Sequence, residues 1–230
     1  MSQLTLEQIS ENLDSANTRD RMVALANLRD VEASVAVPLI KKVLDDKNLQ
    51  IRSMAVFALG IKQTDECLPI LVKLLETDPD YSIRAAAAGA LGYLEDERAF
   101  EPLMRSFYED TDWLVRFSTA VSLGNLKDPR ARDALLKALE SEEVVIQQAA
   151  IAALGEIQDV DSVDEILTFA QSEDWLVRQR LAEALGNLPT TKAVSALNFL
   201  SKDNHTNVAT AAMISLRRLE ETGELEKLNL

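Results

Sequence analysis

The residues of this sequence that could take part in chemistry are mainly carboxylates and arginines. His205 is the only histidine and Cys67 the only cysteine, so Ser-His-Asp triads, Cys-His pairs and multi-histidine metal sites are excluded. The glycines occur singly rather than in a phosphate-binding loop. No catalytic residue and no metal ligand is therefore assigned, and any activity must depend on carboxylates, arginines and the shape of the surface. Cys67 begins an apolar segment, where a buried thiol is expected.

Arginine recurs in one column of the sequence, at intervals of 31 or 32 residues or twice that spacing. The column contains Arg21, Arg52, Arg84, Arg116 and Arg178, with Gln147 and Ala209 in two further copies. The position four residues earlier is occupied by Asn17, Asn48, Asp80, Asp112, Glu143, Asp174 and His205, most of them residue types that cap helices. A contact of the Asp80 to Arg84 type, within or between repeats, would link neighbouring units. We interpret the arginine column as a structural ladder.

Leucine and glycine recur with the same period. The leucine column contains Leu28, Leu59, Leu91, Leu123, Leu154, Leu185 and Leu216, and the next position is glycine in five copies, at Gly60, Gly92, Gly124, Gly155 and Gly186. Residues 98–110 and 112–126 each place apolar residues three and four positions apart, which predicts two amphipathic helices per copy. Such a unit buries its apolar face only by stacking on its neighbours. The sequence therefore predicts an all-α, right-handed α-solenoid of about seven short HEAT-like helical hairpins.

The repeats define the predicted organisation of the chain. We expect a single array over residues 1–230, with repeats at approximately 4–31, 34–62, 65–94, 97–126, 129–157, 160–188 and 190–219 and a short acidic tail at 220–230. In each second helix the capping residue marks the start, and the glycine or a following asparagine is expected to mark the end.

Aromatic residues are concentrated on the second helices of the repeats. Positions 1, 5, 9 and 13 after the capping residue are expected to face the concave side, which solenoids use for ligands. Six aromatic residues occupy such positions: Phe57, Tyr81, Tyr93, Trp113, Phe117 and Trp175. Ala85 and Gly89 lie between them, so the prediction is a trough with aromatic walls and a low floor that binds a ligand or partner. The alternative is that these side chains pack on neighbouring helices.

The charge balance limits the classes of partner. The net charge is −14, and without a basic stripe such a surface would be repelled by nucleic acid. The acid excess either serves solubility or favours basic or neutral protein partners. No apolar run approaches the roughly 20 residues of a membrane span, and residues 1–14 lack the features of a signal peptide. We therefore expect a cytoplasmic protein without membrane insertion.

The repeat core, as in IRAAAAGALG, and the string DWLVR at 112–116 and again at 174–178 resemble the phycobilin lyase HEAT-like repeats of cyanobacteria. That family includes the E and F subunits of phycocyanobilin lyase and the non-bleaching B protein, and the resemblance covers roughly residues 17–219. It implies an action on or with phycobiliprotein subunits, by attaching a bilin to a partner cysteine or detaching it. It also implies phycocyanobilin, an open-chain tetrapyrrole, as substrate or ligand rather than as a permanently bound cofactor.

The residues offer groups that suit a bilin. Aromatic walls would contact its conjugated plate, and Arg84, Arg116 and Arg180 could meet its propionates. Asp80, Asp112 and Asp174 could meet its pyrrole nitrogens. The alternative function is a non-enzymatic adaptor that binds another protein in the concave groove, for which an A-type iron–sulfur carrier is one candidate partner.

Overall fold

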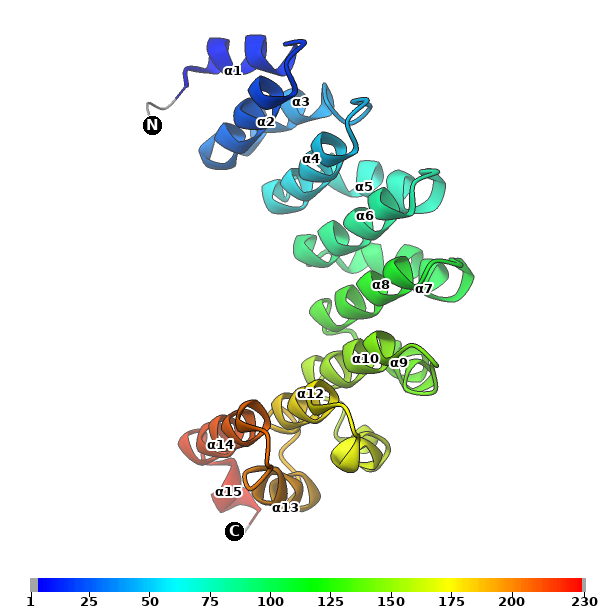
Figure 1. The fold of residues 1–230 in the computed structure, drawn as a ribbon, viewed down its shortest axis with the longest axis vertical. Coiled ribbons are helices and arrows are strands. Elements are labelled where there is room, and N and C mark those ends of the chain that lie inside the picture. Colours follow the sequence, from blue (N-terminus) through cyan, green and yellow to red (C-terminus); the bar gives the residue numbers. More distant parts are fainter. Residues whose placement is uncertain (1–3, 229–230) are drawn as a thin grey trace. The chain divides into compact units, whose positions relative to one another are not determined.

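The structure, a computed structural model, describes residues 4–228, and every regular element in that range is helical (Figure 1). This confirms the predicted all-α solenoid. The chain divides into two compact units, of which the first ends at Ser122 and the second begins at Leu123, within a helix. Whether residues 1–230 act as a single array stays a prediction. None of the described helices combines the length and apolar content that a membrane crossing requires.

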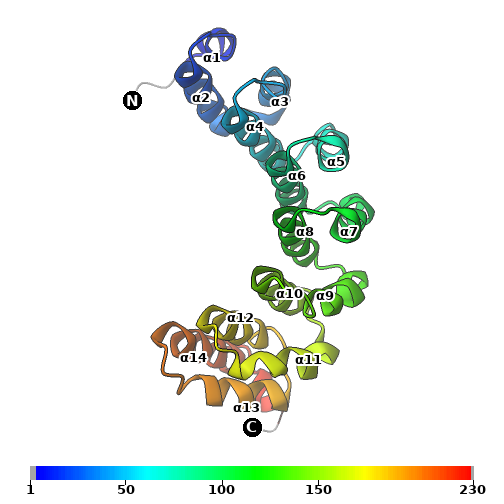
Figure 2. The ribbon, with the colours of Figure 1, turned by 45° about the vertical axis from the view of Figure 1, so that its right-hand side comes forward.

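The first unit contains four helical hairpins. Their first helices are α1 (Leu6–Leu13), α3 (Ala33–Lys41), α5 (Cys67–Thr77) and α7 (Phe100–Glu109). Their second helices are α2 (Thr18–Asn27), α4 (Leu49–Lys62), α6 (Tyr81–Leu94) and α8 (Trp113–Asn125). Short 3₁₀ turns η1 (Leu28–Asp30) and η2 (Glu97–Ala99) precede α3 and α7. In Figure 2, α2, α4, α6 and α8 follow one another in one layer, and α3, α5 and α7 form the other.

The second unit repeats this plan. Its first helices are α9 (Arg132–Ala138), α11 (Val163–Leu167) and α13 (Thr191–Leu200), and its second helices are α10 (Val144–Glu156), α12 (Trp175–Leu185) and α14 (Thr206–Glu221). The 3₁₀ turns are η3 (Pro129–Ala131), η4 (Val160–Ser162) and η5 (Thr168–Gln171). The predicted tail at 220–230 contains the end of α14, Gly223 and the short helix α15 (Glu224–Lys227). Residues 229–230 lie outside the described residues.

The second helices begin as the sequence predicts. Side-chain oxygens accept hydrogen bonds from free backbone N–H groups in the first turn at Asn17, Asn48, Asp80, Asp112 and Asp174. Glu143 and His205 occupy the same column but make no such bond. The leucine column is fully buried at its six positions from Leu28 to Leu185. These leucines form the core between the two layers of each unit.

The prediction that glycines end the second helices is wrong for Gly60, Gly92, Gly124 and Gly155, although Gly186 does cap α12. Gly60 and Gly92 lie inside α4 and α6 rather than at their ends. A Cβ atom at Gly60 would be 2.8 Å from the Cα of Ala90 on the next second helix, and one at Gly92 would be 2.6 Å from the Oγ of Ser122. These glycines therefore allow neighbouring second helices to approach closely. α4 and α6 end instead at the left-handed residues Gln63 and Glu95, and Lys127 and Gln158 are left-handed two residues after the ends of α8 and α10.

Candidate functional site

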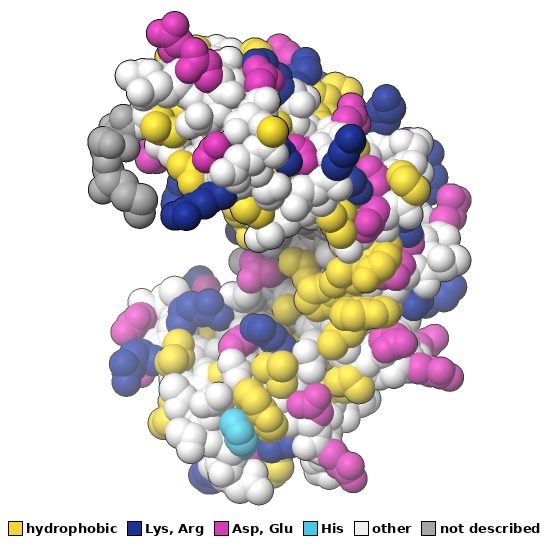
Figure 3. All heavy atoms as spheres, turned by 45° about the horizontal axis from the view of Figure 1, so that its top comes forward, with side chains coloured by type: hydrophobic (Ala, Val, Ile, Leu, Met, Phe, Trp, Pro, Cys, Tyr) yellow, Lys and Arg dark blue, Asp and Glu magenta, His cyan; other side chains and the backbone are white. Residues whose placement is uncertain are grey.

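The aromatic residues predicted on the concave side of the first unit are exposed. Phe57 on α4, Tyr81 and Tyr93 at opposite ends of α6, and Trp113 on α8 are 45–54% exposed. Phe117, one turn after Trp113, is partly exposed. Figure 3 shows hydrophobic side chains gathered in a band on the surface. These five residues, which we call the aromatic stripe, therefore keep much of their surface exposed, although Phe57 also packs on the neighbouring helix through Tyr93.

The surface between the aromatic side chains of the stripe is formed by small residues, as the sequence predicts. Ala85 is 6% exposed, and no neighbouring atom lies within 4 Å of the position that a Cβ atom at Gly89 would take. Tyr81 and Tyr93 stand on either side of this floor on the same helix. The ring of Phe57 meets that of Tyr93 edge to face, with centroids 5.8 Å apart. The contact joins the aromatic residues of α4 and α6 into one surface.

The helices that carry the stripe contain no acidic residue. The sequences of α4, α6 and α8 include neither Asp nor Glu, although the chain has 38 acidic residues. They also contain no histidine and no cysteine. Carboxylates occur only next to them, as in the capping residues Asp80 and Asp112. The stripe is thus an apolar surface with little capacity for general acid or base catalysis.

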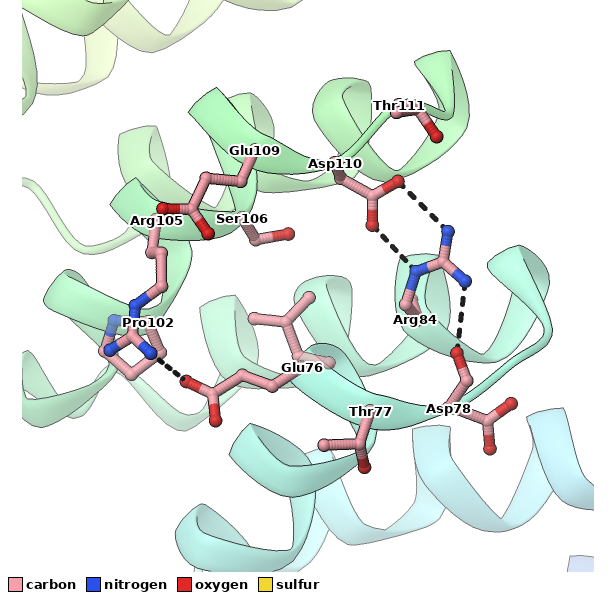
Figure 4. Close-up of a pocket in the computed structure, with 11 residues that line it drawn as sticks. Glu76, Thr77, Asp78, Arg84, Pro102, Arg105, Ser106, Glu109, Asp110 and Thr111 are labelled. Carbon is pink, nitrogen blue, oxygen red and sulfur yellow. Dashed lines mark hydrogen bonds and ion pairs between the residues drawn. The ribbon is translucent and has the colours of Figure 1, made fainter.

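Three arginines of the ladder connect successive repeats through a different carboxylate from the capping residue that was predicted. Arg84 binds both oxygens of Asp110, at 2.7 and 3.0 Å, and donates to the carbonyl oxygen of Asp78 at 3.1 Å (Figure 4). Asp110 follows the first helix of the next repeat, whereas the predicted partner Asp80 caps the helix of Arg84 itself. Arg21 and Asp46, and Arg178 and Asp203, form the same bidentate pairs. Arg52 lies 4.0 Å from the capping carboxylate Asp80 of the next repeat, which is the predicted kind of partner. The three bidentate pairs join consecutive hairpins, so the ladder is structural at these positions.

These ion pairs change the acidity of the carboxyl groups. For Asp110, burial opposes ionisation, but the hydrogen bonds from Arg84 and from the backbone of Asp112 lower its pKa overall. The pKa of Asp46 is lowered in the same way, against burial, by Arg21 and the backbone of Asn48. In Asp203 the hydrogen bond from Arg178 is the main cause of the lowered pKa. All three carboxylates are held ionised by the ladder.

A polar pocket of about 440 Å³ lies beside the Arg84 pair, between the ends of α5 and α7 (Figure 4). Its cations are already engaged, because Arg84 binds Asp110 and Arg105 pairs with Glu76 at 3.1 Å. Among the described residues, no group of His, Cys, Asp or Glu side chains could hold a metal ion. The buried thiol of Cys67 contacts the hydroxyl of Thr64 at 3.2 Å, as expected for a structural cysteine.

The other groups proposed for a bilin differ in availability. Arg180 pairs with Glu183 at 2.8 Å on α12. The buried Nε of Arg116 makes no hydrogen bond to any described residue. Asp80, Asp112 and Asp174 use a side-chain oxygen for capping. Arg116 is therefore the arginine of the three whose side chain is least committed to the scaffold.

Trp175 belongs to the second unit and has a different environment. Its ring stacks on that of His205, with centroids 4.1 Å apart and an interplanar angle of 13°. The neighbouring concave positions on α12 are polar, because Gln179 donates to Glu183 at 2.8 Å. The aromatic stripe thus lies within the first unit, and the binding role expected of Trp175 stays a prediction.

A second pocket in the first unit was not predicted. It has a volume of about 410 Å³, lies between α2 and α4, and is lined by Leu25, Ala26, Arg29, Met54, Phe57, Ala58, Ile61 and Lys62. Phe57 belongs both to this pocket and to the aromatic stripe. One signal in the sequence could have revealed the pocket. The position after Leu28, which is glycine in five other copies, is Arg29 in the first.

Solved structures share the fold of this chain. The complex of CpcE and CpcF of phycocyanin lyase from Nostoc sp. PCC7120 is similar to this chain, with a TM-score of 0.64 and 22% identity over 95% of this chain and 96% of that chain. A structure of Kap95p with RanGDP gives a TM-score of 0.60 and 14% identity over 96% of this chain and 36% of that one. An engineered protein gives a TM-score of 0.55 and 20% identity, over 100% of this chain and 72% of that chain.

Comparison with protein sequences identifies the family. No curated protein sequence matches this chain. The family of HEAT repeats matches residues 6–88, 68–152 and 133–217, which together span nearly all of the described helices. With its stacked helical hairpins and their repeated capping, leucine and arginine columns, this chain belongs to the HEAT-repeat family.

Proposed function

We propose that this protein binds a partner protein along the aromatic stripe of its first unit, and that the partner is a phycobiliprotein subunit. The observation that carries the proposal is the row of half-exposed aromatic side chains on helices without a carboxylate. Tyr and Trp are enriched in the anchors of protein interfaces, while charged side chains are depleted from interface cores. HEAT-type solenoids offer such a surface along their stacked second helices.

The phycobiliprotein partner is suggested by similarity and by the shape of the stripe. The CpcE–CpcF complex of phycocyanin lyase shares the fold over the length of both chains. Tyr81, Tyr93 and Trp113 offer flat faces for an open-chain tetrapyrrole, and the space above Gly89 would admit it. Cys67 is buried, so a bilin would be joined to, or released from, a cysteine of the partner. In this proposal phycocyanobilin is a transient ligand, and Arg116 is the nearest candidate to meet a propionate.

The test is to mix the purified protein with holo-phycocyanin and, separately, with free phycocyanobilin, while the visible spectrum and complex formation are followed. We expect Trp113→Ala and Phe117→Ala to weaken binding at least about tenfold, as for buried interface anchors. Gly89→Leu should block the trough sterically. Phe199→Ala is the matched control, because this exposed aromatic residue lies on α13 in the second unit. Unchanged binding by all three stripe variants would contradict the proposal.

A purely binding scaffold is the second candidate function. The absence of Asp, Glu, His and Cys from α4, α6 and α8 favours it, because the stripe then offers no carboxylate, imidazole or thiol for proton transfer. One form of this candidate is an adaptor for an A-type iron–sulfur carrier. Co-purification of such a carrier with wild-type protein, together with an unchanged bilin spectrum, would select this function over the first.

A further inference from the structure

The junction between α2 and α4 differs from the other junctions between second helices. At Gly60, Gly92, Gly124, Gly155 and Gly186, an added Cβ atom would lie within 2.5–2.9 Å of an atom on the next second helix. The first repeat has Arg29 at this position. An arginine cannot occupy the space that the glycines leave, because even one carbon atom there would clash. The α2–α4 junction must therefore be wider than the others.

The exposure of the facing residue shows this difference. In five repeats the residue opposite the glycine is 0–3% exposed, and these residues are Ala90, Ser122, Ala153, Ala184 and Ser215. The corresponding residue on α4, Ala58, is not buried. It lines the pocket of about 410 Å³ together with Arg29. The replacement of glycine by arginine thus accounts for a pocket at this junction.

The lining of the pocket is apolar, with two positively charged side chains. Its walls are formed by the side chains of Leu25, Ala26, Met54, Phe57, Ala58 and Ile61. Arg29 and Lys62 supply the charged groups, and no carboxylate lines the pocket. The Lys62 ammonium donates to the carbonyl oxygens of Arg29 and Val31, at 2.7 and 2.5 Å. Among the described residues, no ion pair involves Arg29.

We propose that this pocket binds a small apolar monocarboxylate, of the type of a medium-chain fatty acid. The hydrocarbon chain lies against the apolar walls, and the carboxylate accepts two hydrogen bonds from the exposed Arg29 guanidinium. The volume falls in the range of about 300–1,000 Å³ that is usual for small-molecule sites. An unpaired cation in a chain of net charge −14 complements one anionic group. The pocket adjoins the aromatic stripe through Phe57, but this proposal does not rest on the proposed phycobiliprotein function.

The experiment is isothermal titration calorimetry of the full chain with decanoate, with decanol as the neutral ligand of equal chain length. We expect saturable binding of one decanoate, with decanol at least about tenfold weaker because it lacks the charge. Arg29→Gln should weaken decanoate binding by about the same factor while leaving decanol binding unchanged. Ala58→Leu should abolish binding of both ligands because it fills the pocket. Circular dichroism of each variant checks that the fold is retained.

Two control variants locate the site. Arg29 lies in η1, directly after α2. Arg19→Gln removes an exposed arginine of α2 that does not line the pocket, and it should leave decanoate binding unchanged. Trp113→Ala should also leave it unchanged, because Trp113 is on the stripe but outside the pocket. The proposal is overturned if wild-type protein does not bind decanoate, if Arg29→Gln binds as wild type does, or if Trp113→Ala is the variant that loses binding.

Discussion

Two neighbouring junctions of the first unit show how one residue sets the distance between helices. Between α4 and α6, Gly60 allows the backbone of Ala90 to lie where a side chain would otherwise be. Between α2 and α4, Arg29 takes the place of the glycine, and an apolar pocket of about 410 Å³ lies between the helices. The closely packed junction supports the scaffold, while the wider one offers a binding site.

The two junctions share the leucine column, because Leu28 and Leu59 are both fully buried. Their arginines differ. Arg21 binds both oxygens of Asp46 across the α2–α4 junction, whereas Arg52 lies 4.0 Å from Asp80 across the α4–α6 junction. The glycine column distinguishes the junctions further, because α2 ends before Arg29 while Gly60 lies inside α4. The following predictions test this interpretation.

The largest effect is expected for the core of the closely packed junction. Leu91→Ala removes a fully buried side chain from α6, and it should lower the free energy of unfolding by about 2–5 kcal/mol. Leu25→Ala should cost less, because Leu25 lines the α2–α4 pocket and water can occupy the space that the substitution creates. Urea unfolding followed by circular dichroism measures both. Equal losses would mean that the two junctions are packed alike.

Two glycines of α6 should respond to alanine in opposite directions. Gly92→Ala introduces a carbon atom 2.6 Å from the Oγ of Ser122, and such overpacking should cost about 1–3 kcal/mol. Gly89→Ala places the same atom in open space, so the higher helix propensity of alanine should stabilise the protein by up to about 1 kcal/mol. Both substitutions are made in one helix, so each is the control for the other. A stabilising Gly92→Ala would refute the close approach in this column.

The ladder should make stability depend on pH in the acidic range. Because the pKa of Asp46, Asp110 and Asp203 is lowered below its ordinary value of 3.8, their contribution is complete above that value. It is lost as the pH falls through the lower pKa of the folded protein. Arg84→Ala should cost about 1–2 kcal/mol at pH 7 and reduce the loss on acidification. Thermal melts between pH 7 and pH 2 test this, with Arg19→Ala as the control. An equal pH dependence in Arg84→Ala would exclude the ladder as its cause.

The smallest effect on stability is expected at the wide junction itself. Arg29→Ala removes an exposed side chain without an ion pair among the described residues, so unfolding should change by no more than about 0.5 kcal/mol. Gly60→Ala at the equivalent position of the next repeat should be clearly destabilising. Parallel urea titrations of the two variants give the comparison. A large loss in Arg29→Ala would show that arginine holds this junction together.

Much of the fold could be predicted from spacing alone. Period, apolar columns and capping residues are local properties of the chain, and the helices predicted at 98–110 and 112–126 are α7 and α8 with their ends shifted by a few residues. The exposed stripe could also be predicted, because helical geometry fixes which positions share a face. The burial of Cys67 followed from its apolar segment.

The remaining features depend on contacts between repeats. A glycine near the end of a helix fits both a cap and a close approach, and only the position of Ala90 or Ser122 distinguishes the two. In the same way, Arg84 has Asp80 nearby in sequence, but Asp110 is the carboxylate that its side chain reaches. Trp175 shares its column with Trp113, yet His205 covers it. In each case the deciding residue lies about 30 positions away, in the next copy.

The ladder has a consequence for how such a chain can grow. Three junctions carry a bidentate ladder pair, and in each of them the arginine comes from one copy and the carboxylate from the next, as Arg84 and Asp110 show. A duplicate of a repeat that has both residue types would therefore bring complementary halves for its new neighbours. Copies with Gln147 or Ala209 in the column lack the arginine, and a duplicate of one of them would not form the pair with a following copy. The ion pairs thus favour duplication of some repeats over others.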